Sequence, residues 1–286
     1  MSDFVQQQNT ICDFSNSDSW VILSPIEQSI KRKIENVGTP LKDWDINIYR
    51  GVLTGYNEAF IISSEKRDEI LENCQTEDER RRTEELIRPI LRGRDIKRYG
   101  YVNNGLYLIN THNGIRGRMP RIKIEDYPAI KAHLDQYWNR IATRADKGDT
   151  PYNLRNCAYL EDFSKQQIVW IELSDEPKFA LAHNITSVNT VFFMTGEHIL
   201  HLLGLLNSKL ITWYFRHCIG TTSGVGTNRW LKYTIEQIPM APSDPRVEEL
   251  AVKISEEYSD ELNRSIDRIV CDLYHLDDNE LNYILA

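Results

Sequence analysis

Short apolar runs alternate along this chain with longer stretches in which apolar residues recur every three or four positions. The short runs are rich in β-branched and aromatic residues and predict strands, at residues 44–50, 59–63, 105–110, 167–173, 178–181 and 190–194. The longer stretches predict helices, at residues 66–72, 77–90, 124–145, 199–215 and 247–273, with a short final helix near residues 277–284. The pattern predicts an α+β fold, with a mixed β-rich central part, flanking helices and a helical C-terminal segment.

Helix-capping residues and prolines divide the sequence into three parts. Ser24 caps a first predicted helix, because Pro25 follows it and Glu27 stands three residues after the cap. Three prolines between residues 239 and 245 mark a boundary before the last helices. We expect an entry segment over residues 1–45, a central domain over residues 46–242 and an acidic helical segment over residues 243–286.

A loop in the central domain has the pattern Gly51-x-x-Thr54-Gly55-x-Asn57 between two apolar runs. Glycine lets a backbone approach a bulky neighbour or adopt positive φ. Thr, Asn and the intervening Tyr56 supply hydrogen-bonding groups and a stacking face. Two strands joined by such a loop would present polar side chains to a large partner. The alternative is an ordinary hairpin turn, in which Gly and Asn are common.

Composition indicates a globular protein with a substantial core. Of 286 residues, 41% are hydrophobic and 27% are charged, which suits one large domain or two ordinary ones. We find no apolar run long enough to span a bilayer and no signal-peptide pattern. The five cysteines are scattered and never in Cys-x-x-Cys spacing. Reduced thiols in a cytoplasm fit this pattern best, and a zinc site or disulfide framework does not.

The net charge of −8 is unevenly distributed. Residues 243–286 contain 12 acidic and four basic residues, so this segment alone has a balance of −8. Residues 80–123 contain 12 basic and three acidic residues, a balance of +9. This asymmetry predicts an anion-binding face and a separate acidic module. Alternatively, the arginines at residues 80–82 pair with the acids at residues 77–79 on a solvated helix face.

A search for catalytic patterns finds no convincing constellation. The chain has no Gly-x-Gly-x-x-Gly after a strand, no phosphate loop with a lysine and no Gly-x-Ser-x-Gly elbow. His198 and His201 are three residues apart without a neighbouring ligand. Asp175 and Lys178 flank a proline in an expected turn, which disfavours a nuclease cluster. We therefore expect no catalytic residue and no metal ligand in this chain.

Five blocks follow one another along the chain: the Gly51 to Asn57 loop, residues 88–99 (RPILRGRDIKRY), residues 127–134 with 144–148 (RADKG), residues 170–172 (WIE) with 205–210 (LLNSKL), and residues 266–276 (IDRIVCDLYHL). In this order they resemble the TaqI-like C-terminal specificity domain of type IIG restriction-modification enzymes and N6-adenine DNA methyltransferases. The resemblance implies that residues 46–242 recognise a target sequence in double-stranded DNA.

The resemblance also implies a catalytic partner. Such enzymes carry a methyltransferase domain with an S-adenosylmethionine loop and an Asn-Pro-Pro-Tyr motif, and neither pattern is present here. We expect a non-catalytic specificity part of a restriction-modification system, either an excised fragment or a split subunit. It would position a target adenine for a methyltransferase domain in cis or trans, and S-adenosylmethionine would bind only there. The alternative is an assembly module in which the acidic helical segment binds protein and DNA contact is incidental.

The basic stretch supplies the main candidates for DNA contact, because Arg and Lys bind phosphates and read guanine. They are Arg92, Arg94, Lys97, Arg98, Arg116, Arg118 and Arg121. Further candidates are Thr54, Tyr56, Asn57 and the loop from residue 221 to Arg229.

These candidates also have structural interpretations. Arg94 and Asp95 would then form an internal salt bridge, the two loop glycines would be backbone hinges, and Asn57 would cap a turn. Asn207 and Ser208 lie in an apolar helix, so we expect them to satisfy buried backbone groups. The acidic C-terminal helix should face away from DNA and pack on the chain or on a partner.

Overall fold

The computed structural model describes residues 23–220, 222–223 and 227–286. The chain forms two compact units. Unit 1 comprises Met1–Ile46, Glu172–Phe179 and Gly196–Ala286, and unit 2 comprises Asn47–Ile171 and Ala180–Thr195. Residues 1–22 of the expected entry segment lie outside the described residues. The division into an entry segment, a central domain and an acidic helical segment, at residues 45 and 242, stays a prediction.

Two four-stranded sheets form the frame of unit 2. The first has the order β2-β10-β6-β8, with β2 (Ile46–Arg50), β10 (Val191–Gly196), β6 (Gln166–Ile171) and β8 (Ala180–His183). The second has the order β3-β5-β4-β9, with β3 (Ile61–Ser63), β5 (Leu106–Ile109), β4 (Ile87–Leu91) and β9 (Thr186–Ser187). Each strand predicted for these sheets lies within about two residues of its expected bounds, and the α+β class is confirmed.

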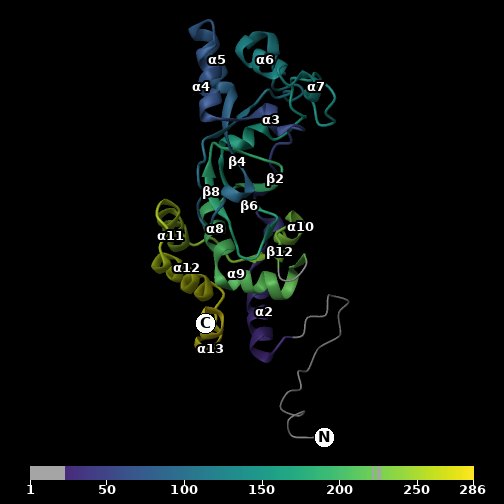
Figure 1. Cartoon of the computed structure of the whole chain (residues 1–286). Coiled ribbons are helices and arrows are strands. Elements are labelled where there is room, and N and C mark those ends of the chain that lie inside the picture. The colour runs from purple at the N-terminus through teal and green to yellow at the C-terminus, as the bar shows by residue number, and fades with distance from the viewer. Residues whose placement is uncertain (1–22, 221, 224–226) are drawn as a thin grey trace. The chain divides into compact units, whose positions relative to one another are not determined.

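Short helices complete unit 2, and Figure 1 shows α4 to α7 gathered at one end of it, beyond the sheets. They are α3 (Asn57–Phe60), α4 (Ser64–Glu72), α5 (Glu77–Leu86), α6 (Pro128–Asp135) and α7 (Trp138–Ile141), with single turns η2 (Gly93–Asp95), η3 (Ile124–Asp126) and η4 (Leu160–Ser164). One buried hydrophobic cluster joins the sheets to the helices, with Phe60, Leu108, Ile130, Val169 and Phe193 fully covered.

Unit 1 is mainly helical. Its helices are α2 (Pro25–Val37), η1 (Leu41–Asp43), α8 (Ile199–Asn207), α9 (Lys209–Tyr214), η5 (Phe215–Ile219), α10 (Lys232–Ile235), α11 (Pro245–Glu256), α12 (Asp260–Leu273) and α13 (Asp278–Leu285). Its strands are β1 (Thr39–Pro40) with β13 (Pro239–Met240), and β11 (Thr222–Ser223), β12 (Thr227–Arg229) and β7 (Leu173–Ser174). Helix α11 packs on α8, so the acidic segment covers the chain itself, as expected. In the described part of the chain, no helix is long and apolar enough to cross a membrane.

Asn207 and Ser208 satisfy buried backbone, as predicted. The Asn207 side-chain amide donates to the carbonyls of Phe179 at 2.8 Å and Leu203 at 3.2 Å. The Ser208 hydroxyl donates to the Leu205 carbonyl and accepts from the Ile211 amide, which caps α9. Both side chains are fully buried.

Three predicted helices are interrupted in the structure. The helix expected over residues 124–145 begins only at Pro128, because a residue before proline is forced out of the helical region. Residues 199–215 break at Ser208, and residues 247–273 break at Ser259. Each of these serines is extended and caps the next helix, so the side chain competes with helix continuation. Apolar spacing alone did not reveal these breaks.

The hairpin alternative for residues 48–62 is wrong, since β2 and β3 belong to different sheets and α3 lies between them. The helix expected over residues 77–90 ends at Leu86, and β4 follows immediately. Pro89 lacks the amide that a helix interior needs, and the flanking isoleucines favour a strand.

Gly51 is a point of close backbone contact. A Cβ atom there would lie 2.2 Å from the Ser187 carbonyl oxygen and 2.3 Å from that of Val188. The adjacent Val52 amide donates to the Ser187 carbonyl at 2.7 Å. Gly55, in contrast, has φ +71 and faces Arg144. The two glycines therefore fix the path of the loop. They act as rigid points of the backbone and not as the hinges that the structural interpretation expected.

Arg144 holds the segments around this loop together. Its guanidinium donates to the carbonyls of Asp146 at 3.1 Å, Pro151 at 2.6 Å and Asn153 at 2.6 Å. It lies 4.3 Å from the centre of the Phe60 ring. Only 7% of Arg144 is exposed. Two blocks of the family resemblance, the Gly51 loop and residues 144–148, thus meet at one buried cation.

Replacing Gly51 should destabilise unit 2. In Gly51→Ala the new methyl group would overlap two carbonyl oxygens, so we expect the free energy of unfolding to fall by about 2 kcal/mol or more. Gly100→Ala is the matched control, because nothing lies within 4 Å of its added Cβ, and its change should stay within about 0.5 kcal/mol. Urea denaturation measures both; equal effects would contradict the contact.

Arg144→Met should remove the guanidinium donor from the carbonyls of Asp146, Pro151 and Asn153 while keeping much of the side-chain volume. We expect a loss of about 3 kcal/mol, because each acceptor loses a charged donor. Arg155→Met is the control, since Arg155 is exposed and pairs only with Asp146, a surface pair whose loss costs less than about 1 kcal/mol. Comparable unfolding midpoints for the two variants would exclude a special role for Arg144.

Candidate nucleic-acid interface

The basic stretch separates into an ion-paired helix and two loops of unit 2. On α5, Arg81 and Arg82 pair with Asp78, and Arg80 donates to the Leu71 carbonyl at 3.1 Å. This part is the solvated helix face that the sequence allowed. Arg88 lies on β4 and Lys123 just before η3. The other bases lie in the first basic loop (residues 92–104) and the second basic loop (residues 113–121).

The first basic loop is a tight turn anchored by a buried tyrosine. The Lys97 amide donates to the Gly100 carbonyl at 2.8 Å and closes the turn. Tyr99 is 1% exposed with φ +67, and its carbonyl accepts from the Leu181 amide of β8 at 3.2 Å. The Arg98 guanidinium lies 5.6 Å from the Tyr99 ring centre. The anchored turn keeps Lys97 exposed at the surface.

Asp95 organises the base of this loop through Arg92. The Arg92 Nε donates to Asp95 at 3.2 Å, the Arg92 amide donates at 3.1 Å, and Asn104 donates at 2.7 Å. The expected Arg94–Asp95 salt bridge is therefore wrong, because Arg92 occupies that role. Arg94 and Lys97 are exposed and have no ion-pair partner among the described residues. They are the cations of this loop left available to a partner.

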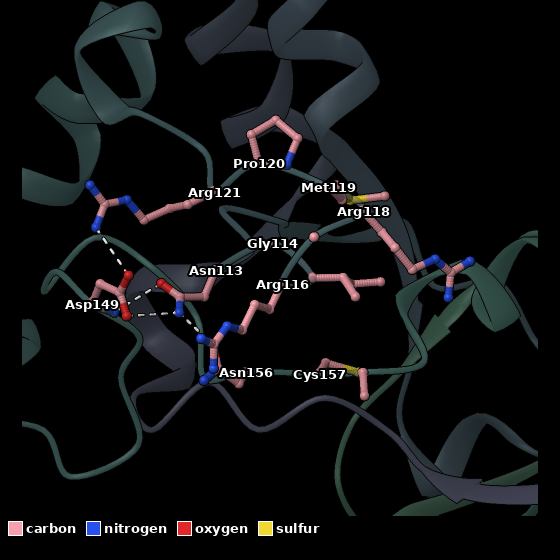
Figure 2. A pocket seen from close by; sticks show the side chains of 13 residues that line it. Asn113, Gly114, Arg116, Arg118, Met119, Pro120, Arg121, Asp149, Asn156 and Cys157 are labelled. Carbon is pink, nitrogen blue, oxygen red and sulfur yellow. Dashed lines mark hydrogen bonds and ion pairs between the residues drawn. The ribbon is translucent and has the colours of Figure 1, made fainter.

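The second basic loop carries three exposed arginines on a narrow turn. Ile115 and Met119 face each other in an antiparallel bridge that closes the turn. Figure 2 shows the arginines spreading from it, with Arg121 directed toward Asp149, Arg116 toward Asn156 and Arg118 to the opposite side. The loop therefore presents guanidinium groups in several directions at once.

A hollow of about 820 Å³ lies between this loop and residues 149–158. Arg121 pairs with Asp149 across it at 3.2 Å, and Asn113 bonds both to Asp149 and to Asn156 (Figure 2). Arg118 pairs with the exposed Glu161. Arg116 has no acidic partner within the described ranges, so its charge is uncompensated locally.

The candidates in the Gly51 to Asn57 loop make contacts within unit 2. The Thr54 hydroxyl donates to Asn57 at 2.6 Å, and Thr54 is 2% exposed. Tyr56 packs against the core cluster and lies 6.1 Å from the Tyr137 ring centre. Asn57 is exposed and begins α3, where its side chain accepts from Thr54.

Arg229 belongs to unit 1, whereas the other candidates before residue 122 belong to unit 2. It lies on β12 and pairs with Glu172 at 2.8 Å. The hydrogen bond from this pair raises the pKa of Arg229. Residue 221 and residues 224–226 of the candidate loop lie outside the described residues, so their part in the prediction stays untested.

Sequence reasoning missed the amide side chains that line unit 2. Asn113 and Asn156 are brought together by the turn that Arg144 holds. Asn153 donates to carbonyls on both sides of the second basic loop, to that of His112 before it and to that of Ile122 after it at 2.9 Å. These residues are about 40 positions apart, and asparagine is common in turns. No local pattern could have identified them; only the fold juxtaposes them.

A family model, the TaqI-like C-terminal specificity domain, matches residues 88–240, which include both basic loops. The chain belongs to this family. A comparison with curated proteins found no match.

Solved structures show the fold of this specificity domain in larger enzymes. The type IIL restriction-modification enzyme MmeI, solved in complex with DNA, matches with a TM-score of 0.58, 13% identity, 86% of this chain and 35% of its own. The type IIG restriction endonuclease BpuSI matches with a TM-score of 0.55, 13% identity, 90% of this chain and 32% of its own. The chain thus spans about a third of the length of each.

The chemistry that these loops offer is anion binding and hydrogen bonding. Exposed guanidinium and ammonium groups suit phosphates, and arginine also reads guanine. No group of three or more His, Cys, Asp and Glu side chains that could hold a metal occurs in the part of the chain that the structure covers. The Asp175 carbonyl accepts from Arg216 and Asn228, which fits the structural turn expected around residues 175–178.

The stability contributed by Asp95 should depend on pH. Burial raises the pKa of its carboxyl group, but hydrogen bonds from Arg92 and Asn104 lower it more, so the net pKa lies below its usual value. Such a group stabilises the fold above its unfolded pKa of about 3.9, and this contribution is lost as the pH falls through the lower folded value. We expect Asp95→Asn to be less stable than the parent at pH 7.

Urea titrations at pH 7, 4 and 3 check this prediction. The difference in stability between parent and Asp95→Asn should shrink below about pH 4. The exposed Asp126 supplies the control variant Asp126→Asn, which should follow the parent at every pH. A constant deficit of Asp95→Asn down to pH 3 would show that packing, not the charge, accounts for it.

Proposed function

We propose that unit 2 recognises a specific sequence in double-stranded DNA through its two basic loops. The observation that carries the proposal is the second basic loop, where three exposed arginines border a hollow of about 820 Å³ and Arg116 has no acidic partner among the residues that the structure describes. Arg94 and Lys97 on the first basic loop add exposed cations to the same unit. Membership in the specificity-domain family and the likeness to MmeI, which was solved with DNA, support it.

The candidates divide by role on this proposal. Arg94, Lys97 and Arg116 are free to contact phosphates or guanine edges, which guanidinium groups bind bidentately. Arg118 and Arg121 would exchange their carboxylate partners for DNA. Arg92 and Thr54 support the loops through internal hydrogen bonds. Tyr56 and Asn57 stand beside them in the scaffold, and Arg98 and Arg229 would contribute at the margins.

We further infer that recognition serves a methyltransferase. The chain would position a target adenine for a methyltransferase domain in cis or trans, and S-adenosylmethionine would bind in that domain. The chain itself would act as a non-catalytic specificity part of a restriction-modification system in the cytoplasm of a bacterium. This inference rests on the family, whereas DNA contact also rests on the charges of unit 2.

The assembly-module alternative has less support. The apolar residues of the acidic helices are used inside unit 1, since Val247, Ala251, Ile266, Val270 and Tyr274 are fully buried. A partner could meet only the acidic outer face. Sedimentation of a chain shortened at Pro242 would test it, because loss of an oligomer together with unchanged DNA binding would favour assembly.

Salt dependence gives the direct test of DNA contact. The chain, alone or joined to its methyltransferase half, should bind a random pool of duplexes more weakly as salt rises from about 50 to 200 mM. Arg116→Ala should lower the slope of log K against log salt by about 0.9 if Arg116 contacts one phosphate. If Arg116 reads a base, the variant should instead lose about 1–3 kcal/mol and relax the selected sequence at one position.

Arg81→Ala is the matched control for this measurement. Arg81 is 72% exposed and pairs with Asp78 on α5, outside both basic loops. Its removal takes away the same charge and should leave slope and sequence preference unchanged. If the parent shows no salt-sensitive DNA binding, even when joined to the methyltransferase half, the proposal is wrong. If Arg81→Ala and Arg116→Ala lose equal DNA affinity, the binding is nonspecific electrostatic attraction and not recognition by the second basic loop.

A further inference from the structure

A smaller hollow of about 370 Å³ lies beside the one bordered by the arginines. The two share Asn156 and Cys157 as lining residues, so they are adjacent in unit 2. Val52, Leu154 and Leu160 give the smaller hollow apolar walls. Its size is within the range of about 300–1,000 Å³ typical of small-molecule sites.

Asn110, His112 and Asn189 are among the polar residues that line this smaller hollow. In the described ranges, neither asparagine side chain has a hydrogen-bond partner, and the Asn110 Oδ1 atom is buried without one. The His112 Nδ1 accepts from the Gly114 amide at 3.2 Å, which leaves the proton on Nε2. Burial lowers the pKa of His112, so the ring is a neutral donor at physiological pH.

These groups suit a flat heterocycle with a hydrogen-bonding edge. An asparagine amide matches adenine with one donor and one acceptor, and an imidazole N–H adds a donor for a ring nitrogen or carbonyl. Apolar walls accept the faces of such a ring, as flipped-base pockets do. A base within an intact duplex cannot enter a recess of this size, whereas a single unstacked base can.

We propose that this smaller hollow receives one unstacked nucleobase of the bound DNA, held at its polar edge by Asn110, His112 and Asn189. The proposal rests on the proposed DNA recognition by unit 2, because the arginine-bordered hollow would hold the strand from which the base is turned out. Unstacking has an energetic cost that is smallest for a mismatched or bulged base. A duplex with such a base should therefore bind more tightly.

Fluorescent 20-base-pair duplexes provide the probe. They share one sequence, enriched from the random pool, and carry at each position in turn a normal pair, a mismatch or a single-base bulge. We expect one register at which the bulged duplex binds about tenfold or more tighter than the paired one, because the unstacking cost is already met. With 2-aminopurine at that position, its emission should change on binding as the base leaves the stack.

Asn189→Ala and Asn110→Ala should each remove the preference for the bulge. Asn189 is exposed, so its variant keeps the test valid even if Asn110→Ala fails to fold. Asn139→Ala is the control, because Asn139 is an exposed asparagine of unit 2 on α7 that lines neither hollow. It should retain the full preference.

The outcomes separate the two proposals. Salt-sensitive duplex binding with equal affinity for paired and bulged DNA at every register would overturn the base pocket and leave DNA recognition intact. Binding of free adenosine monophosphate that depends on Asn189, without any bulge preference, would overturn it in favour of a mononucleotide site. Failure to bind any duplex would overturn both.

Discussion

The buried guanidinium of Arg144 is the constraint on which the arrangement of unit 2 depends. Burying a cation is costly, and burial lowers the pKa of Arg144 to about 10 although Asp146 raises it. At neutral pH the group is still charged. Three carbonyls and the face of Phe60 replace the lost water, so the charge stabilises only this one path of the chain. Any other path would leave it without acceptors.

The hydrogen bonds around Arg144 extend to both hollows. Arg144 fixes Asn153 by its carbonyl, and the Asn153 side chain donates in turn to the carbonyls of Thr111, His112 and Ile122. The second basic loop begins and ends within this set of contacts. The arginine-bearing turn therefore projects from a rigid base, and the side chains on it can hold a defined geometry. Loops that position binding groups commonly depend on such a scaffold.

Much of the fold and part of the site could be predicted from the sequence, for identifiable reasons. Runs of β-branched residues predicted most of the strands. Ser24 and Pro25 predicted a helix start that the structure reproduces. Helix breaks at Ser208 and Ser259 were missed, because a capping serine and a helical serine look alike in an apolar pattern. The excess of basic residues in the basic stretch could be counted directly from the sequence. Which of its arginines are paired depends on acids such as Glu161 that only the fold brings near.

A chain with a negative net charge can still bind a polyanion through its basic loops, because only nearby charges act on a bound group. Interactions between exposed charges fade beyond about 8–10 Å at physiological salt, so the acids of residues 243–286, which lie in unit 1, need not cancel a patch of unit 2. Within unit 2 the same rule makes the nearest acids decisive. Among the described residues, Arg118 and Arg121 pair with carboxylates, whereas Arg94, Lys97 and Arg116 have no ion-pair partner. The field that a polyanion meets at the basic loops thus depends on these local pairings more than on the net charge of −8.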